Sequence, residues 1–536
     1  MSRNSVRGCQ IMKKFISKFV RTIKRIFNRT VICVLGILIQ LSYLIWLFWM
    51  FGTTFSYSYW IFEVAAILIA FTIVNSDKHP SYKISWILPI LIMPIFGVML
   101  YVCFGNGNSA AHLRKRMNQF NEEEHLLLTQ NNEIIKQLQD SDDIEIKSVE
   151  KQANYLYNYG GYPIYTNSQV TYFECGEAKF TAMCEELEKA QRFIFLEYFI
   201  VQEGIMWDTI LEILERKVKE GVDVRMVYDD IGCLKTLPYK YYEKMEKKGI
   251  KCKTFNKFHP FWVARMNNRD HRKILVIDGH TAFNGGVNLA DEYINAIKRF
   301  GDYWKDSAVM IKGEAVWSFT MMFLTMWNYL NNAKPHDCND YMPKEQEIAE
   351  YRGYHGLVIP YTDSPLDKES VGENTYLSII NNATDYVYIT TPYLVITNEL
   401  ESALSLAAKS GVDVRIITPH VPDKWYVLAV TRSYYKNLTK NGVKIYEYTP
   451  GFIHAKNFVS DDKVGVVGTI NLDYRSLYLH FECGTYMYKT DCLLDVKNDF
   501  LKTLEQCQKI TYDDCLKVNV FRRLGRSILR LFAPLM

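Results

Sequence analysis

The chain has 536 residues, enough for two to four domains, and 49% of them are hydrophobic, which allows a large buried core. Its formal net charge is +4 and its pI is about 8.2. Nine Lys and Arg residues fall within the first thirty positions without any Asp or Glu, so the rest of the chain is close to neutral or slightly acidic. This distribution argues against a general nucleic-acid-binding surface.

The N-terminal part predicts a transmembrane region at 31–104, preceded by a basic amphipathic segment at 1–30. Apolar stretches run over Val31–Phe51, Tyr59–Val74 and Trp86–Phe104. The first is uncharged and long enough to cross a bilayer core of about 30 Å. Its length and the lack of a clean small-residue cleavage site favour a retained anchor over a cleaved signal peptide. We therefore expect a multi-pass protein of the cell membrane.

Two features leave the topology of this region open. Pro89 and Pro94 in the third stretch predict a kinked helix, or one that enters the membrane and returns. Apolar and basic residues alternate at helical spacing over 11–29, which fits either a helix on an anionic membrane surface or a positive flank of the first span. Three full spans place the following domain outside the cell, whereas a re-entrant third stretch places it inside. The basic cluster at 114–116 favours the inside.

After residue 104 the pattern becomes that of an α/β protein. We expect a linker and connecting helix at 105–150, followed by a first catalytic half at 151–345 and a second at 346–515. A basic amphipathic segment at 516–536 ends the sequence.

The α/β region contains an internal duplication with a period of roughly 190 residues. A buried strand at 193–201, a helix to about Lys219 and the strand VDVRMVYDD correspond to YVYITTPYLV, a helix and VDVRIITPH later in the chain. The pentapeptide GVDVR occurs at 221–225 and again at 411–415. We therefore expect two homologous α/β halves, each a mixed sheet flanked by helices, packed around one site at their seam.

Each half contains one HxKxxxxD motif. The motif residues are His271, Lys273 and Asp278 in the first half, and His454, Lys456 and Asp461 in the second. A gapless alignment also matches Gly285 with Gly468, and Asn288 with Asn471. A single copy carries little weight, because composition alone produces such patterns. Two copies with the same downstream Gly and Asn are a specific signal.

The spacing of these residues predicts phosphodiester chemistry. In a strand, residues i and i+2 face the same side, so the His and Lys of each motif project together. A pseudo-twofold seam then brings two imidazoles and two ammonium groups around one phosphate diester. The lysines and the Asn amides hold the non-bridging oxygens. One imidazole attacks phosphorus, and the other protonates the leaving alkoxide and later deprotonates the acceptor hydroxyl.

These paired motifs resemble the HKD motifs of the phospholipase D superfamily, and longer blocks resemble its bacterial-type cardiolipin synthase branch. The blocks are LEYFIV at Leu196, NNRDHRKILVIDG at Asn267, GDYWKDSAVMIKGEAV at Gly301, ITTPYLV at Ile389 and GTINLDYRSLYLHFE at Gly468. The apolar segments to Phe104 resemble the N-terminal hairpin of that branch, and FRRLGRSILRLFAPLM resembles its basic, apolar C-terminus. The resemblance covers most of residues 59–536.

The resemblance implies a phosphatidyltransferase that condenses two phosphatidylglycerols to cardiolipin and glycerol through a phosphohistidine. It implies no cofactor and no required metal. It also implies that His271 is the nucleophile and His454 the general acid and base. The expected partners are phosphatidylglycerol and anionic membrane lipid, without nucleic acid.

The orienting carboxylates of the family map to Asp306, in WKD, and Glu482, in HFE, and Glu197 is a further candidate close to the site. Each carboxylate is expected to accept from the ring nitrogen that does not react and so to fix the tautomer of a histidine. The chain departs from the family at Lys305, where Arg is frequent, and at Ser307, where Thr is frequent.

Three other functions remain open at this stage. A hydrolytic phospholipase D uses the same intermediate, which water or a lipid hydroxyl can attack. A membrane-anchored phosphodiesterase or nuclease uses the same chemistry, although the charge distribution argues against it. A non-catalytic membrane scaffold is the third, and the two intact motifs argue against it. The twelve cysteines form no CxxC pair and no Cys/His cluster with zinc spacing, so we expect neither a metal site nor a disulfide framework.

Overall fold

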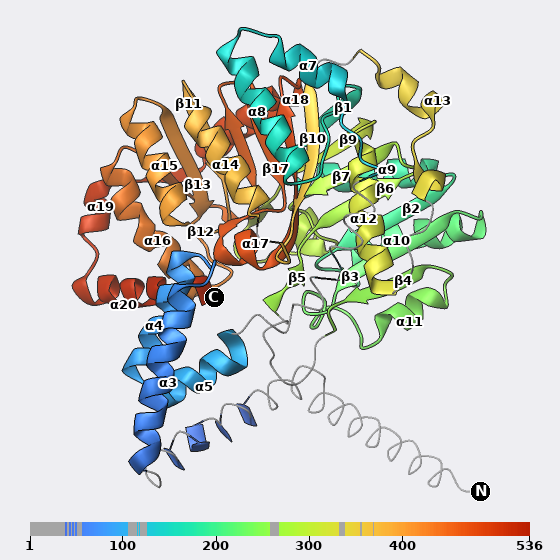
Figure 1. Cartoon of the computed structure of the whole chain (residues 1–536). Helices are drawn as coiled ribbons and strands as arrows, with labels where there is room; N and C mark the ends of the chain where they lie inside the picture. The colour runs from blue at the N-terminus through green and yellow to red at the C-terminus, as the bar shows by residue number, and fades with distance from the viewer. Residues whose placement is uncertain are drawn as a thin grey trace, which may run out of the picture.

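The computed structural model describes residues 56–105, 126–257, 267–331, 338–353, 356–367 and 369–535, with isolated positions between 38 and 50 and at 115 and 117. The predicted amphipathic segment at 1–30 and more than half of the first predicted span lie outside the described residues. The described chain forms two α/β halves side by side, with N-terminal helices next to the second half (Figure 1).

The first half is built on a seven-stranded mixed sheet. In sheet order its strands are β1 (Ser168–Phe173), β9 (Ala308–Gly313), β7 (Thr281–Gly285), β6 (Lys273–Ile277), β2 (Phe193–Tyr198), β3 (Asp223–Asp229) and β4 (Lys251–Phe255). β2, β3 and β4 are parallel, and the other neighbours are antiparallel. β2 and β6 are buried along their whole length, which matches the continuous apolar runs of these segments.

The second half repeats this order of strands and adds one strand at its edge. In sheet order its strands are β10 (Leu357–Asp363), β19 (His480–Tyr488), β17 (Val464–Gly468), β16 (Asn457–Ser460), β11 (Tyr386–Thr390), β13 (Asp413–Pro419), β14 (Lys444–Tyr448) and β20 (Cys507–Ile510). A two-stranded pair, β12 (Leu394–Val395) and β18 (Leu472–Asp473), lies beside the sheet. The expectation of two homologous mixed-sheet halves is therefore confirmed.

The helices recur in the same positions of the two halves. The first half has α9 (Gly176–Lys189), α10 (Ile205–Lys219), α11 (Tyr241–Glu246) and α12 (Val316–Asn331), and the second has α14 (Val371–Asn382), α15 (Asn398–Lys409), α16 (Trp425–Lys440) and α18 (Cys492–Leu504). α12 contacts β10 of the second half, and α18 contacts β1 of the first. The halves thus exchange helix contacts, and one hydrophobic cluster extends through both of them.

The glycine that follows each motif permits a close approach of two strands. Gly285 has φ +147°, and a Cβ there would lie 2.5 Å from Cα of Ala308 on the neighbouring strand β9. A Cβ at the matched Gly468 would lie 2.4 Å from the carbonyl oxygen of Cys483 on β19. Any larger residue would push apart the strands that carry the site.

Two helices precede the first half, and the later one packs on the second half. These are α7 (Asn132–Gln139) and α8 (Ile144–Asn158), so the predicted boundary at residue 150 falls within α8. Tyr155 on α8 donates to Glu369 at 2.7 Å, and Glu145 pairs with Lys463 at 2.6 Å. This connecting helix therefore ties the start of the α/β region to its second half.

The N-terminal helices form a small group of their own (Figure 1). They are α3 (Ser56–Val74), α4 (Pro80–Ile92), α5 (Pro94–Leu100) and the π-helical turn Tyr101–Gly105. The third predicted apolar stretch breaks between α4 and α5 at Pro94, as its prolines predict, whereas Pro89 lies inside α4. None of the helices in the described part of the chain has both the length and the apolarity that a bilayer crossing requires.

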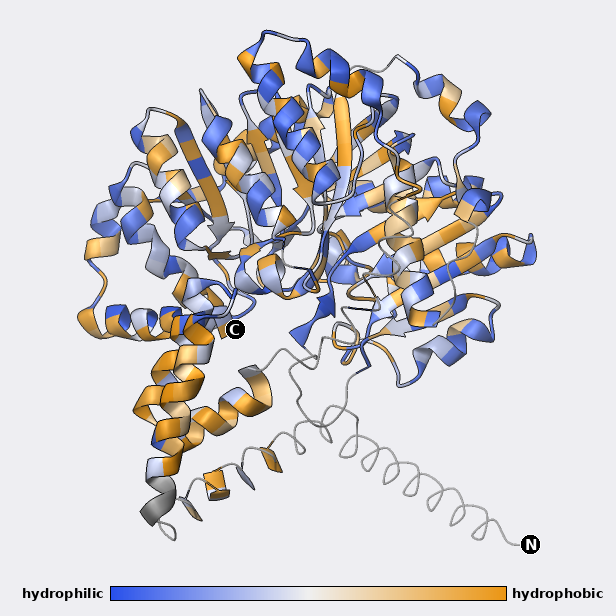
Figure 2. Cartoon of the chain, in the orientation of Figure 1, coloured by the Kyte–Doolittle hydropathy of each residue, from blue (hydrophilic) through white to orange (hydrophobic). Residues whose placement is uncertain are grey.

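An amphipathic helix near the C-terminus, α20 (Val520–Leu531), lies where the N-terminal helices meet the second half, and it contacts α4 and α16. Ser85 on α4 donates to the carbonyl oxygen of Leu531 at 2.7 Å. Phe521 and Leu524 on α20 are exposed. In Figure 2, α3 and α4 are mostly in the colours of hydrophobic residues, and such residues also occur on α20.

Candidate active site

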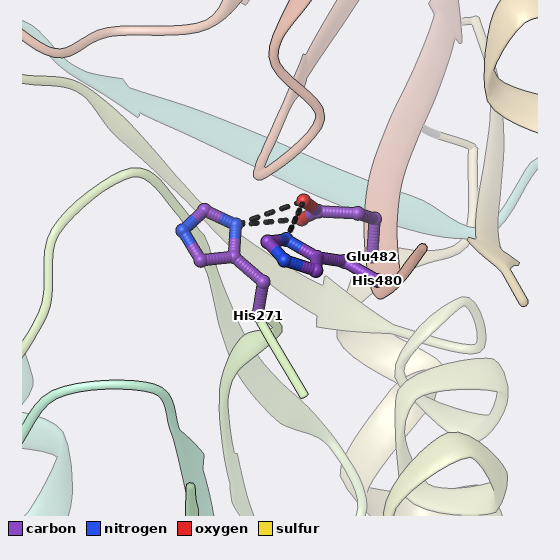
Figure 3. A group of neighbouring side chains, drawn as sticks. All are labelled: His271, His480 and Glu482. Carbon is purple, nitrogen blue, oxygen red and sulfur yellow. Dashed lines mark hydrogen bonds and ion pairs between the residues drawn. The ribbon is translucent and has the colours of Figure 1, made fainter. Parts of the chain in front are cut away.

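The histidine of the first motif is held by a carboxylate from the other half. His271 lies between β5 (Arg269–Asp270) and β6. Its Nδ1 is 2.9 Å from each carboxylate oxygen of Glu482 on β19, and both side chains are buried (Figure 3). When Nδ1–H donates to this carboxylate, the lone pair on Nε2 is left free to react.

The histidine of the second motif repeats this arrangement with the halves exchanged. His454 follows β15 (Gly451–Ile453), and its Nδ1 is 2.7 Å from Oδ2 of Asp306. Asp306 is fully buried and follows β8 (Tyr303–Lys305) of the first half. Each half therefore supplies the carboxylate for the histidine of the other, and neither half has a complete site alone.

Two short parallel strand pairs between the halves bring each histidine to the carboxylate of the other half. β5 pairs with β19, and the backbone N–H of His271 extends the ladder by donating to the carbonyl oxygen of Phe481 at 2.9 Å. β15 pairs with β8, and the N–H of His454 donates to the carbonyl oxygen of Lys305 at 2.7 Å. The segment before each histidine is thus hydrogen-bonded to the segment that carries its carboxylate.

The histidines lie just before the strands rather than within them, which corrects the predicted geometry. β6 begins at Lys273, and β16 begins only at Asn457. The Nζ of Lys273 donates to the carbonyl oxygen of His271 at 2.5 Å, and Lys456 bonds that of His454 in the same way. The backbone leaves its own sheet at these positions because it pairs with the other half.

The two motif lysines are buried, and burial lowers their pKa. The pKa of Lys273 falls to about 8 and that of Lys456 to about 7, against the opposing effect of Glu482 and Asp306. For Lys456 the charge of Lys273 lowers the pKa further. A bound anion favours the protonated lysines, so the site is suited to a phosphate diester.

The pKa values of both histidines lie below the ordinary range. Burial lowers the pKa of His271 well below 6.5, and the charges of Lys273 and Lys456 add to this effect. Burial and Lys456 lower the pKa of His454 to about 4, while Asp306 raises it through its charge and its hydrogen bond. Burial by itself would raise the pKa of Asp306, but His454 and Lys456 outweigh it and keep that pKa below its usual value. Both imidazoles are therefore neutral in the free protein at neutral pH.

The two carboxylates have different surroundings. Thr469 donates to Oε2 of Glu482 at 2.5 Å, and the hydroxyl of Ser476 donates to Oε1. Gly286 occupies the position matched to Thr469, and a Cβ there would lie 2.0 Å from Oδ1 of Asp306. Glu482 is thus held by side-chain donors, whereas Asp306 accepts from the backbone N–H of Ser307 at 2.9 Å and leaves no room for a side chain at position 286.

The last residue of each motif is not brought to the imidazoles. Asp278 accepts hydrogen bonds from the three consecutive backbone N–H groups at 191–193, with distances of 2.7, 2.7 and 2.9 Å. Asp461 does the same for the N–H groups at 384–386. Both have positive φ and lie at the end of the strand opposite to the motif lysine. They hold the start of β2 and β11, and the groups that donate to these carboxylates in this way are backbone N–H groups rather than imidazoles.

The two matched asparagines differ in what they offer a ligand. Oδ1 of Asn288 accepts from the backbone N–H of Ile200 at 3.0 Å, and its amide donates to Tyr293 at 2.7 Å. Asn471 is also buried, but its Oδ1 has no hydrogen-bond partner among the described residues. The free Oδ1 of Asn471 is an acceptor, so it cannot itself hold a non-bridging phosphate oxygen.

Glu197 lies behind the first motif rather than beside a histidine. Its Oε1 is 2.6 Å from Arg272, whose Nε is 3.3 Å from Asp270. Asp229 accepts from the N–H of Asp270 at 3.1 Å and lies 3.4 Å from Arg269. These five side chains are buried and form a charged cluster that supports the segment leading to the site.

A third histidine that sequence reasoning did not single out lies next to the first pair (Figure 3). His480 and Glu482 lie two residues apart on β19, and the His480 ring centroid is 5.5 Å from that of His271. Burial lowers the pKa of His480 to about 3, against the opposing effect of Glu482. The alternation of strand residues was the signal that could have found it, since His480 and Glu482 share one face.

Comparison with known proteins gives the family. The sequence matches the family described as cardiolipin synthase, PLD-like domain, over residues 183–327 and 376–504, and the phospholipase D-nuclease N-terminal family over 64–106. A cardiolipin synthase of Geobacillus kaustophilus is 32% identical over 479 residues, which cover 88% of this chain and 92% of that protein. An uncharacterised protein of Streptococcus mutans is 48% identical over 471 residues, which cover 87% and 98%.

A solved structure of phosphatidylserine synthase from Haemophilus influenzae has the same fold, with a TM-score of 0.53 at 16% identity over 72% of this chain and 97% of that one. Two homologous α/β halves that share one site with two carboxylate-held histidines are the architecture of the phospholipase D-like class. Within that class, the chain belongs to the family of cardiolipin synthase, PLD-like domains.

Proposed function

We propose that the protein is a cardiolipin synthase, which transfers a phosphatidyl group from one phosphatidylglycerol to the headgroup hydroxyl of another and releases glycerol. The crossed pairs His271–Glu482 and His454–Asp306 carry this proposal, because they leave two Nε2 atoms free at one site. The relatives named cardiolipin synthase support the choice of substrate.

In the first half of the reaction, Nε2 of His271 attacks phosphorus and forms the phosphohistidine. The bond to the glycerol oxygen breaks, and Nε2–H of His454 gives that oxygen its proton. In the second half, His454 takes the proton from the headgroup hydroxyl of a second phosphatidylglycerol. The resulting alkoxide attacks phosphorus, and the bond to His271 breaks.

The unequal environments of the histidines support this division of roles. The main influences on the pKa of His271 all lower it, which favours the unprotonated nucleophile. Asp306 raises the pKa of His454 and therefore favours its proton-carrying form. A bound phosphodiester adds negative charge next to both rings, which raises the pKa of His454 towards the range in which it can act as an acid.

The two motif lysines complete the proposed site. Lys273 and Lys456 stabilise the charge on the non-bridging oxygens as phosphorus becomes five-coordinate. Aromatic rings surround the imidazoles, with Phe199 at 4.9 Å from His271 and Trp304 at 5.6 Å from His454 between ring centroids. These rings reduce the access of water, which favours transfer to a lipid hydroxyl over hydrolysis.

We also propose that the protein acts while attached to the cell membrane. Trp60, Leu68 and Phe71 on α3 are exposed, as are Phe521 and Leu524 on α20. An exposed apolar surface of this kind fits a lipid environment. The predicted multi-pass arrangement remains a prediction, because no helix among the described residues, which include the second and third apolar stretches, has the length and apolarity of a membrane span.

Incubation of the full-length protein with phosphatidylglycerol vesicles, followed by thin-layer separation of the lipids, tests the function. We expect cardiolipin and glycerol in equal amounts, on vesicles that carry the protein with them on flotation. The variant His271→Ala should lose the product, whereas His420→Ala, a half-buried histidine outside the site, should retain it. Phosphatidic acid as the main product would instead establish a hydrolytic phospholipase D, and no lipid product from the unmodified protein would remove the proposal.

A further inference from the structure

The proposed transfer leaves one buried histidine of the site without a role. His480 is 8% exposed, and neither of its ring nitrogens has a hydrogen-bond partner in the described part of the chain. Burial of polar atoms without a partner costs free energy, so such a group in a functional site points to something that binds it.

The atoms around His480 have the spacing of metal ligands. Among the described residues, His271, His480 and Glu482 are the group whose potential ligand atoms all lie within 4.8 Å of one another (Figure 3). Nδ1 of His271 is 2.9 Å from the Glu482 carboxylate, and Nδ1 of His480 is 3.6 Å from it. Bonds of about 2.0–2.1 Å in a tetrahedral zinc site place neighbouring ligand atoms roughly 3.3 Å apart, which lies between these two distances.

We propose that one divalent transition-metal ion, such as Zn²⁺, binds to His271, His480 and Glu482. We further propose that this ion inhibits the phosphatidyl transfer. Two imidazoles and a carboxylate are a donor set that such ions prefer, with water completing the coordination. The inhibition rests on the proposed function, whereas the binding of the ion does not.

Inhibition follows from which nitrogen the ion takes. A bond forms between the metal and Nδ1 of His271, the N–H bond there breaks, and Nε2 of the same neutral ring takes up a proton from solvent in exchange. The ion also replaces the hydrogen bond by which Glu482 orients the ring. Nε2 of His271 then carries a hydrogen and has no lone pair with which to attack phosphorus.

The residues around the site suit an ion that binds reversibly rather than one that stays bound permanently. The hydroxyls of Thr469 and Ser476 already donate to Glu482, and such donors hold a metal-binding carboxylate in place. Lys273 and Lys456 oppose a cation, because their ammonium groups lie in the same site. The same electrostatics that favour the phosphodiester therefore limit the affinity for the metal.

Metal binding is measured on the full-length protein in detergent micelles with Co²⁺, whose visible absorption reports four-coordinate binding, followed by displacement with Zn²⁺. We expect one Co²⁺ per chain. The variant His480→Gln removes one ligand and should weaken binding by at least about 10-fold. His480→Asn serves as a second variant with a smaller side chain. The matched control is His420→Gln, because His420 lies 2.7 Å from Glu447 in a His–Glu pair outside the site.

Activity is then followed with and without Zn²⁺ and a chelator. Zn²⁺ should inhibit the unmodified protein and the His420→Gln control, and the chelator should restore the rate. Relative to its own metal-free rate, each His480 variant should need at least about 10-fold more Zn²⁺ for the same inhibition. Equal Co²⁺ binding by the His480 variants and the unmodified protein would overturn the site. Co²⁺ binding as expected without any cardiolipin would remove the proposed function and leave the site standing.

Discussion

The two halves share one backbone frame but differ in what lies behind each motif. The sheets have the same strand order, and each half lends its carboxylate to the other. Behind the first motif lie the buried charges of Glu197, Asp270 and Arg272. The strand register matches these positions to Thr390, Ile453 and Ala455 in the second half, which are also buried but carry no charge.

This difference separates the residues that form the shared site from the residues that hold them in place. The His–Lys pair, the opposed carboxylate and the close-packed glycine occur in both halves, so they are what the shared site requires. The charged cluster occurs in the first half only, so a strand can be held at the site either by ion pairs or by apolar packing. In the proposed mechanism, the pair Glu482–His271 serves the imidazole that attacks and the pair Asp306–His454 serves the imidazole that transfers the proton.

The largest expected effect comes from the two histidines. His271→Ala should abolish covalent labelling of the protein by phosphate-labelled phosphatidylglycerol, because no other proposed nucleophile forms the intermediate. His454→Ala should slow both steps by about 10²–10⁴-fold but still permit slow labelling of His271, more so with a lipid whose leaving group needs no proton. Peptide mapping of the trapped intermediate makes the measurement.

The position of the label decides which half supplies the nucleophile and which supplies the general acid. Label on His454 in the unmodified protein would reverse the two roles. Label on neither histidine would exclude the covalent mechanism. His420→Ala controls for the loss of an imidazole elsewhere and should be labelled like the unmodified protein.

A smaller effect is expected from the crossed carboxylates. Glu482→Gln and Asp306→Asn preserve shape but remove the charge that orients each imidazole, and each should reduce turnover by about 10²-fold or more. A lipid with a good leaving group should rescue the first step in Asp306→Asn but not in Glu482→Gln, because only the former acts through the acid. Turnover and the rate of labelling are measured for both.

The pair His79–Glu399 supplies the control for these variants. Its atoms are 3.2 Å apart, and Glu399 is exposed outside the site. Glu399→Gln should therefore leave turnover unchanged. Equal rescue of both site variants by the good leaving group would mean that the carboxylates do not distinguish the two roles.

The repeat and the motif spacing predicted the two halves and the shared site, whereas the resemblance to a known family supplied Asp306 and Glu482, which lie beside His454 and His271. Sequence reasoning could not predict that each half supplies the carboxylate for the other, because this depends on β5 and β15. These strands are two and three residues long, and in the described part of the chain they pair with strands of the other half. The motif also grouped Asp278 and Asp461 with the chemistry, since a letter pattern does not separate a reacting group from one that caps a strand.

The last prediction tests whether the buried charges of the first half are needed. Arg272→Ala leaves the carboxylates of Glu197 and Asp270 buried without their cation, which should reduce the free energy of unfolding by about 3–5 kcal/mol. The triple variant Arg272→Ala, Glu197→Thr and Asp270→Ile installs the residues that the second half uses at the matched positions. Because apolar packing often replaces a buried ion cluster without loss, the triple variant should recover most of that stability. Denaturant unfolding in detergent micelles measures both. A triple variant less stable than Arg272→Ala would show that the first half depends on its charges, and that the halves are not interchangeable behind their motifs.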